Sequence, residues 1–218
     1  MNNQLFILKH PIEYKYAEDA SLISKAYAQQ YDFTQTTQCP VCGRDASRAL
    51  WLQPRQVVLT SRKLPDFLHT VKSRVPYLLS ERALTEIQNA GLTGIIKAEP
   101  IEHIRYLRKA KIDPPIPNYY YIEVARSKIT VNHELSKIRY GTLRNEDPCP
   151  LCRQVPAVWM AAKELVFNME AYEGYDIFHI YELGETTFVS QRFVDFCQEK
   201  KLTNFLYCPA FDWELGIF

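Results

Sequence analysis

Two short cysteine motifs constrain this chain more than any other feature of its sequence. The first reads Cys39-Pro40-Val41-Cys42-Gly43, and the second, 110 residues later, reads Cys149-Pro150-Leu151-Cys152-Arg153. Two thiols separated by two residues can face one ion across a tight turn, and two such turns supply four thiolates, the complete tetrahedral shell of a structural zinc. We therefore expect a structural Zn²⁺ held by Cys39, Cys42, Cys149 and Cys152.

The sequence around these motifs repeats at the same spacing. When the chain is shifted by 110 positions, ten residues superpose on identical residues: Cys39/Cys149, Pro40/Pro150, Cys42/Cys152, Asp66/Asp176, His69/His179, Ser80/Ser190, Arg82/Arg192, Gln88/Gln198, Leu92/Leu202 and Thr93/Thr203. This pattern predicts an internal duplication in an α+β fold, with a cysteine knuckle, strands and one helix in each β-rich half. We place the halves at residues 1–112 and 113–218 and expect them to form one compact unit.

A helix with a clear capping signal is predicted once in each half. Ser80 is a favourable N-cap, apolar residues follow it at helical spacing, and Gly91 stands where a helix commonly ends. Ser190 opens the matching helix, in which Phe193, Val194 and Cys197 are expected to face inward. A further helix is predicted at residues 18–30, strands at 5–10, 49–60 (interrupted at Pro54), 94–98, 119–125, 157–160, 165–169, 176–181 and 204–208, and a stiff proline connector at 113–118.

The repeat separates cysteines that can bind a metal from cysteines that pack. Cys197 corresponds to Ile87 and Cys208 to Ala98, so both are expected to be small buried apolar residues. Two arrangements of zinc stay open. The two motifs can share one ion, which needs no further residue and is the arrangement we favour. Alternatively, each half binds its own ion with additional ligands, for which the paired candidates are His69 and His179 with Asp66 and Asp176.

Composition and missing motifs exclude several classes of protein. The net charge of +1 gives no whole-molecule field for nucleic acid or membrane, and no apolar run reaches the length of a membrane span. The start of the chain lacks a signal peptide, so we expect a reducing cytoplasm, where metal ligation outranks disulfides. The sequence has no HExxH, GxSxG, phosphate-binding loop or dinucleotide fingerprint, and four cysteines close a zinc shell; we expect no enzyme. A CxxC redox enzyme is the catalytic alternative.

The chain resembles the double-CXXCG motif proteins, a family of bacterial proteins linked to polymorphic toxin systems as immunity proteins. The resemblance rests on both cysteine motifs, on the segment LLSERALTEIQNAGLTGIIKAEPIE and on the following YYYIEV, and it covers residues 35–212. Arg153 departs from the pattern, because it replaces the second glycine. The resemblance implies a cytoplasmic protein that neutralises a cognate toxin by direct binding.

The distribution of charge indicates where a toxin could bind. Residues 1–110 hold 15 Lys/Arg and 10 Asp/Glu, residues 111–218 hold 11 and 15, and residues 164–191 contain no Lys or Arg. An acidic surface with tyrosine anchors suits a basic protein partner, so we expect Glu170, Tyr172, Glu173 and Tyr175 to contribute to the interface. The alternative is a solvated acidic face whose tyrosines pack inward.

The competing function is a zinc-ribbon nucleic-acid binder. It would use two groups of basic residues, Arg44, Arg48, Arg55, Arg62 and Lys63 after the first motif, and Arg105, Arg108, Lys109 and Lys111 further on. Such groups are more often solvated faces, and the acidic second half would repel phosphate. We therefore expect a protein partner, with neither nucleic acid nor membrane bound.

Overall fold

The computed structural model describes residues 4–8, 31–32, 38–43, 50–51, 53–59, 62–69, 77–107, 110–142, 149–151, 157–184 and 186–214. Strands dominate these residues, and two nine-residue α-helices accompany them, which agrees with the predicted α+β class. The helix predicted at residues 18–30 lies outside the described residues. No helix in the described ranges is long and apolar enough to cross a membrane.

The elements follow one another in a similar order in the two parts of the chain. The first part contains β1 (Leu5–Leu8), β2 (Tyr31–Asp32), β3 (Leu50–Trp51), β4 (Gln56–Leu59), β5 (Phe67–His69), β6 (Tyr77–Ser80), α1 (Glu81–Asn89), β7 (Ile95–Pro100) and β8 (His103–Tyr106). The second contains β9 (Tyr119–Ser127), β10 (Thr130–Val131), β11 (Lys137–Thr142), β12 (Ala157–Lys163), β13 (Phe167–Asn168), the 3-10 helix η4 (Met169–Ala171), β14 (Ile177–Ile180), β15 (Thr187–Ser190), α2 (Gln191–Glu199), β16 (Tyr207–Pro209) and the 3-10 helix η5 (Ala210–Asp212).

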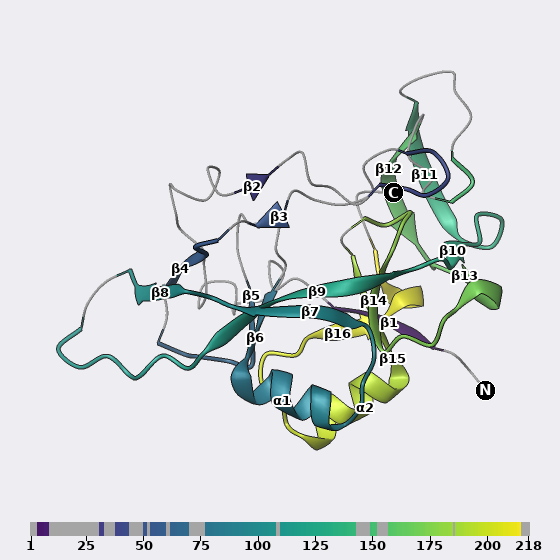
Figure 1. Cartoon of the computed structure of the whole chain (residues 1–218). Coiled ribbons are helices and arrows are strands. Elements are labelled where there is room, and N and C mark those ends of the chain that lie inside the picture. The colour runs from purple at the N-terminus through teal and green to yellow at the C-terminus, as the bar shows by residue number, and fades with distance from the viewer. Residues whose placement is uncertain are drawn as a thin grey trace.

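One eight-stranded sheet contains strands from both parts of the chain (Figure 1). Its hydrogen-bonded order is β16-β1-β15-β14-β9-β6-β5, and β7 pairs with β9 beside this path. Strand β1 pairs antiparallel with β15 and β16, although it belongs to the first part of the chain. Strand β9 pairs antiparallel with β6 and β7 and parallel with β14. The two parts are therefore joined through main-chain hydrogen bonds at the centre of the sheet.

Both helices lie on the same side of this sheet (Figure 1) and begin in the same way. The Ser80 hydroxyl accepts a hydrogen bond from the Ala83 amide at the start of α1, and the Ser190 hydroxyl accepts one from Phe193 at the start of α2, both at 3.1 Å. Each cap satisfies an amide that the first helical turn leaves without a partner. The two helix predictions, including the buried positions of Phe193, Val194 and Cys197, are confirmed.

The main core lies between the helices and the sheet. Twelve of its buried residues form six pairs that are 110 positions apart: Phe67/Ile177, Leu79/Val189, Ala83/Phe193, Leu84/Val194, Ile87/Cys197 and Leu92/Leu202. The pair Ala83/Phe193 combines a small and a large side chain, so the packing differs in detail while the burial is the same. Cys197 and Cys208 are both buried, as predicted from their apolar counterparts.

Smaller elements cover the opposite face of the sheet. At one end, Val57 and Leu59 of the β4–β8 pair pack with Leu68, Leu78 and Tyr119. At the other end lies a second cluster, which contains Leu5, Ile7, Ile129, Val131, Ala162, Leu165, Phe178, Ile180, Leu183, Phe188, Cys208 and Ala210. The sheet is therefore covered on both faces, and its strands β1, β14 and β15 are buried along nearly their whole length.

Two strand predictions need correction. The strand expected at residues 204–208 begins only at Tyr207, because Asn204 has a φ of 60° and its side-chain amide donates to the Phe67 carbonyl at 2.7 Å. The strand expected at residues 165–169 is reduced to Phe167–Asn168, after which the chain forms η4. In both places local turn geometry overrides the apolar pattern. The interruption of the 49–60 strand at Pro54 is confirmed, since β3 ends before it and β4 begins after it.

Gly94 occupies a position that no larger residue can take. Its φ is 111°, and an added Cβ would lie 1.9 Å from the Ile177 carbonyl oxygen. Its own carbonyl accepts from the Ala125 amide at 2.7 Å, so the chain cannot move away without losing that bond.

We expect Gly94→Ala to lower the free energy of unfolding by about 2–4 kcal/mol, measured by urea denaturation. Ile96→Ala, two residues further along in β7, serves as the control, since Ile96 is exposed and should change stability by less than about 0.5 kcal/mol. Equal stabilities for the two variants would contradict the steric explanation.

Candidate metal centre and the contacts between the two halves

Three of the four predicted zinc ligands lie together. The Sγ atoms of Cys39, Cys42 and Cys149 are all within 4.8 Å of one another, and those of Cys39 and Cys149 are 3.8 Å apart. Cys152 lies outside the described residues. The two segments that carry these thiols are 110 residues apart in sequence, so the fold brings them together as the shared-site arrangement requires.

The spacing of the thiols fits a tetrahedral metal shell. A Zn–S bond of about 2.3 Å and a tetrahedral angle place neighbouring sulfurs about 3.8 Å apart, which is the distance between Cys39 and Cys149. A disulfide would need about 2.05 Å. Cys39 and Cys149 are buried, Cys42 is more exposed, and Leu151 and Tyr181 pack against the buried pair. Buried thiols at this spacing are a donor set that suits zinc.

Local structure explains how the first motif turns around its cysteines. The amide of Gly43 donates to the Cys39 carbonyl at 2.8 Å, which closes a turn over the intervening residues. Gly43 has a φ of 68°, a left-handed conformation that glycine adopts without steric cost. The second motif has Arg153 at the corresponding position, outside the described residues.

Tyr181 connects the cysteines to the end of β14. The guanidinium of Arg126 lies 5.8 Å from the centre of its ring and donates to the Gly184 carbonyl at 3.0 Å. Burial lowers the pKa of Arg126 from its usual value, although the guanidinium stays charged. Next along the chain, the buried Glu182 carboxylate accepts from the Val131 amide at 3.1 Å and lies 2.9 Å from Nε2 of His133. The chain beneath the cysteines is thereby anchored by several polar contacts.

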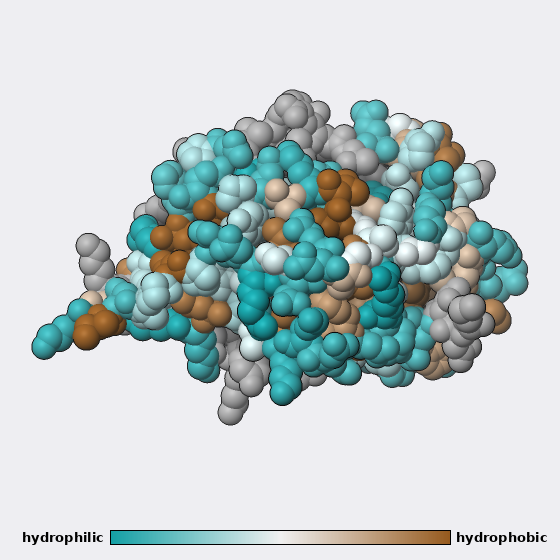
Figure 2. Space-filling model, turned by 60° about the horizontal axis from the view of Figure 1, so that its bottom comes forward, coloured by the Kyte–Doolittle hydropathy of each residue, from teal (hydrophilic) through white to brown (hydrophobic). Residues whose placement is uncertain are grey.

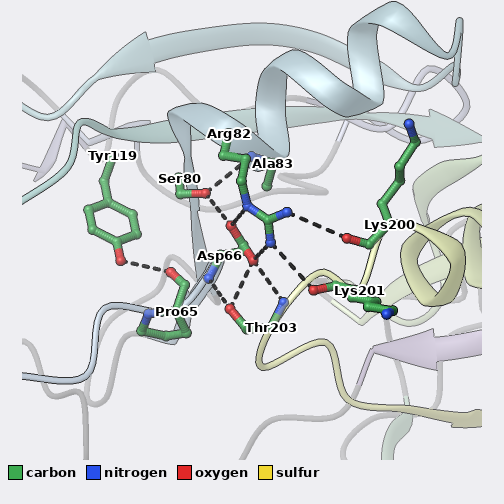
Figure 3. Close-up of polar contacts among 9 residues, drawn as sticks. All are labelled: Pro65, Asp66, Ser80, Arg82, Ala83, Tyr119, Lys200, Lys201 and Thr203. Atoms are coloured by element: carbon green, nitrogen blue, oxygen red, sulfur yellow. Dashed lines mark hydrogen bonds and ion pairs between the residues drawn. The ribbon is translucent and has the colours of Figure 1, made fainter.

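A buried carboxylate joins the start of α1 to the chain that follows α2 (Figure 3). The Asp66 carboxylate accepts from the Ser80 hydroxyl at 2.8 Å, from the Thr203 amide at 2.8 Å and from the Thr203 hydroxyl at 2.9 Å. It also forms an ion pair with Arg82, whose Nε lies 3.1 Å from Oδ1. Thr203 is 137 residues away in sequence, so this cluster crosses between the halves.

The same contacts recur around Asp176, with the halves exchanged. Its carboxylate accepts from the Ser190 hydroxyl at 2.8 Å, from the Thr93 amide at 2.9 Å and from Arg192 at 3.0 Å. Thr93 follows α1, whereas Ser190 and Arg192 begin α2. Each aspartate therefore binds the helix start of its own half and the threonine that follows the helix of the other half. We call these the Asp66 cluster and the Asp176 cluster.

The two arginines also reach the far ends of the opposite helices. Arg192 donates to the carbonyls of Ala90 and Gly91 at 3.0 and 3.4 Å, and Arg82 lies 3.4 Å from the carbonyls of Lys200 and Lys201. These carbonyls belong to the last turns, where no helical amide remains to bind them and where positive charge is favourable. The start of each helix lies beside the end of the other, so α1 and α2 are antiparallel.

Hydrogen bonds determine the ionisation of Asp66. Burial alone would raise its pKa, but donors from Arg82, Thr203 and Ser80 outweigh burial and hold the pKa of Asp66 below its usual value. The ion pair raises the pKa of Arg82. The carboxylate is therefore charged at neutral pH, and its charge is compensated.

Both aspartates and one of the two histidines proposed for the two-ion arrangement have other partners. Asp66 and Asp176 are engaged beneath the helices, and Nε2 of His179 lies 3.0 Å from the Thr187 hydroxyl. The His69 side chain lies outside the described part of the structure. Within the described ranges, Cys39, Cys42 and Cys149 are the single group of three or more potential ligands close enough for one ion. The geometry favours the shared site over two separate ones.

A comparison with known protein families finds a match for the second part of the chain. Residues 105–212 match the immunity protein family Imm11. No curated protein matches the chain. The Imm11 match includes Cys149 and Cys152, Asp176 with Ser190 and Arg192, and α2, and it supports the expectation of an immunity protein. The narrower double-CXXCG assignment stays a prediction.

The predicted partner residues lie at and after η4, within the region matched by Imm11. Glu170 is exposed, while Tyr172 and Tyr175 are partly buried against the second core cluster. The Tyr172 ring centre lies 5.6 Å from that of Phe178, and burial raises the pKa of Tyr172 to about 12. Glu173 accepts hydrogen bonds from the Ser127 hydroxyl and the Lys128 amide. Their role in binding stays a prediction, with Glu170 the most available of the four.

The crossed contacts of Asp66 and Asp176 were missed as a functional unit. The shift of 110 marked Asp66, Ser80, Arg82 and Thr93 together with their counterparts, which was the available signal. It did not say whether each aspartate would meet the threonine of its own half or of the other. Figure 3 shows the second possibility for Asp66.

Proposed function

We propose that this chain is an immunity protein that binds and neutralises a cognate polymorphic toxin in the cytoplasm. The observation that carries the proposal is the match of residues 105–212 to the Imm11 immunity family. The protein acts by binding rather than by catalysis. Its interior is built from interlocked strands and charge clusters, an arrangement that suits a rigid binding scaffold.

The proposal includes an internal duplication of residues 1–112 and 113–218. Three independent features support it: the six core pairs, the matching Asp66 and Asp176 clusters, and the backbone at the helix ends. At the last of these, Gly91 and Gly94 have positive φ, and so do their counterparts Lys201 and Asn204. Lys201 and Asn204 adopt a conformation that costs non-glycine residues energy, which indicates that the backbone is repeated even where the residue type is not.

A structural Zn²⁺ bound by Cys39, Cys42, Cys149 and Cys152 completes the proposed architecture. The ion would supply a cross-link between two segments whose described residues, 39–43 and 149–151, lie in turns and outside helices and strands. The apolar contacts of Cys39 and Cys149 with Tyr181 and Leu151 would shield it from water. Four thiolates leave no open coordination position, so the site has the chemistry of a scaffold rather than of a catalyst.

The function can be tested with the toxin encoded beside this gene. Co-expression of that toxin domain with this chain should restore growth, and titration of the purified toxin should abolish its activity at a stoichiometric ratio. The Gly94→Ala variant, which we expect to be destabilised, should protect less at elevated temperature. A neighbouring gene that encodes no toxin, or a toxin that remains fully active with excess immunity protein, would refute the proposal.

The acidic face gives a more specific prediction. Glu170→Lys should weaken binding of a basic toxin about fivefold to tenfold at low salt, with a smaller effect at high salt, because exposed charges act mainly on association and are screened. Glu199→Lys on α2 is the matched control, since Glu199 is also exposed. Glu173 is less suitable for charge reversal because its carboxylate binds Ser127 and Lys128. Equal affinities for the two lysine variants, measured by calorimetry, would remove Glu170 from the interface.

The nucleic-acid alternative receives less support from the structure. Arg55 is buried and forms an ion pair with Glu99, and Arg62 forms one with Asp113. Both cations are thus compensated within the chain. Arg44 and Arg48 lie outside the described residues.

A further inference from the structure

A loop projects from the body of the molecule at the end opposite β10 and β13 (Figure 1). It comprises residues 110–118, with the sequence AKIDPPIPN, and it follows β8 and precedes β9. In Figure 2 this region extends to the left, and both hydrophilic and hydrophobic atoms lie at its end. We call residues 110–118 the projecting loop.

The projecting loop presents an apolar side chain to solvent. Ile112 is 84% exposed, the highest fraction among the exposed large hydrophobic residues of the described chain. Single exposed apolar residues are common on protein surfaces and mean little alone. Ile112 differs because of its setting: Lys111 and Arg105 are exposed nearby in sequence, and the loop stands away from the sheet. An exposed apolar side chain next to an exposed lysine, on a loop that stands away from the sheet, is suited to contact with a partner.

The loop is also held in one shape. The Asp113 carboxylate accepts from Nε and Nη2 of Arg62 at 2.8 and 2.7 Å and from the Ala110 amide at 3.3 Å. The Tyr106 hydroxyl donates to the Pro114 carbonyl at 3.2 Å, and the Arg62 guanidinium lies 5.3 Å from the centre of the Tyr106 ring.

Three prolines between residues 113 and 118 remove further backbone freedom. Ile112 is therefore presented without the entropy loss that ordering a flexible loop on binding would cost.

We propose that the projecting loop enters a cleft of the toxin, with Ile112 in an apolar pocket and Lys111 against an acidic rim of that cleft, a local patch separate from the basic surface that would face Glu170. This inference rests on the proposed function and names the part of the chain that makes the central contact. The charge of the loop selects the partner surface, because Asp113 is already paired with Arg62 and the exposed Lys111 leaves the loop positive. An exposed side chain that fills a pocket near the centre of an interface, where water is excluded, can contribute much of the binding energy.

The test compares Ile112→Ser with Leu135→Ser. Leu135 is 65% exposed in a turn elsewhere on the chain, so it matches Ile112 in chemistry and exposure but not in setting. Binding to the toxin domain encoded beside this gene should weaken about 30-fold or more for Ile112→Ser and should be unchanged for Leu135→Ser. Both variants should unfold at the wild-type temperature, because neither side chain is buried.

A second variant tests whether the positive charge of Lys111 contributes to binding. Lys111→Glu should slow association with the toxin, and the difference from wild type should shrink as salt rises. Wild-type affinity for both Ile112→Ser and Lys111→Glu would overturn the role of the loop while leaving the proposed function intact. Absence of toxin binding by the wild-type protein would instead overturn both. Binding of a short DNA duplex that is lost in Lys111→Glu, with toxin binding unaffected, would assign the loop to nucleic acid and also refute the proposal.

Discussion

Replacing Asp66 with Asn is expected to lower the free energy of unfolding by about 2–4 kcal/mol. The substitution preserves size but removes the charge that Arg82, Ser80 and Thr203 all bind. The Asp66 side chain is only 7% exposed, so water cannot fully replace these contacts, whereas Arg82 is half exposed and can be partly rehydrated. The loss should therefore fall below that for breaking a fully buried ion pair.

The measurement is urea unfolding of four proteins. Asp176→Asn should match Asp66→Asn, since its contacts are the same with the halves exchanged. Asp195→Asn on the exposed face of α2 is the control and should change stability by less than about 0.5 kcal/mol. If the Asp66 and Asp176 variants were as stable as the Asp195 variant, the two clusters would not contribute to the stability of the fold.

The same cluster sets a dependence on pH. Because the pKa of Asp66 is lower in the folded protein than in the unfolded chain, its contribution to stability is fully present above the unfolded value of about 3.9 and is lost as pH falls through the folded value. The stability difference between wild type and Asp66→Asn should therefore shrink in acid. A difference that stays constant from neutral pH to about pH 2 would contradict the lowered pKa.

Removal of zinc is expected to have the second large effect on the stability of the folded protein. Free zinc at about a thousand times its dissociation constant stabilises a folded protein by about 4 kcal/mol, and chelation should remove that contribution. Because the sheet and the Asp clusters already join the halves, the helices should persist at moderate temperature in the chelated protein. The loss should appear as a lower unfolding temperature and as greater protease sensitivity near residues 38–43 and 149–151.

Elemental analysis measures directly how many zinc ions each chain binds. Wild-type protein should contain one zinc per chain, and Cys39→Ser and Cys149→Ser should contain none. Cys208→Ala is the control, since Cys208 is buried in the second core cluster and should leave the zinc content unchanged. Two zinc ions per chain would favour separate sites, and a metal-free wild-type chain with unchanged stability would refute the metal centre.

The parts of the fold that the sequence predicts are those governed by local rules. Ser80 and Ser190 precede apolar residues at helical spacing, so both helix starts follow from capping. The three prolines of residues 113–118 allow no helix, and none forms there. The convergence of the cysteines was likewise expected, because one ion needs ligands from both motifs.

The contacts between the halves could not be predicted, for a physical reason. Asp66 and Thr93 occur in one half and Asp176 and Thr203 in the other, so pairing within a half and pairing across halves satisfy the same groups. The choice depends on how the central sheet arranges the halves, which short-range patterns do not contain. The parallel pairing of β4 with β8 escaped prediction similarly, because its two strands are brought together only by the intervening helix and strands.

The antiparallel helices have a consequence for shortened versions of the protein. Each arginine at a helix start donates to main-chain carbonyls of the other half of the chain. Each threonine that follows a helix donates to the aspartate of the other half. A break near residue 110 therefore leaves neither fragment with a complete set of partners. Neither fragment is a self-sufficient module, and deletion mapping of the interface would report loss of folding before it reported loss of binding.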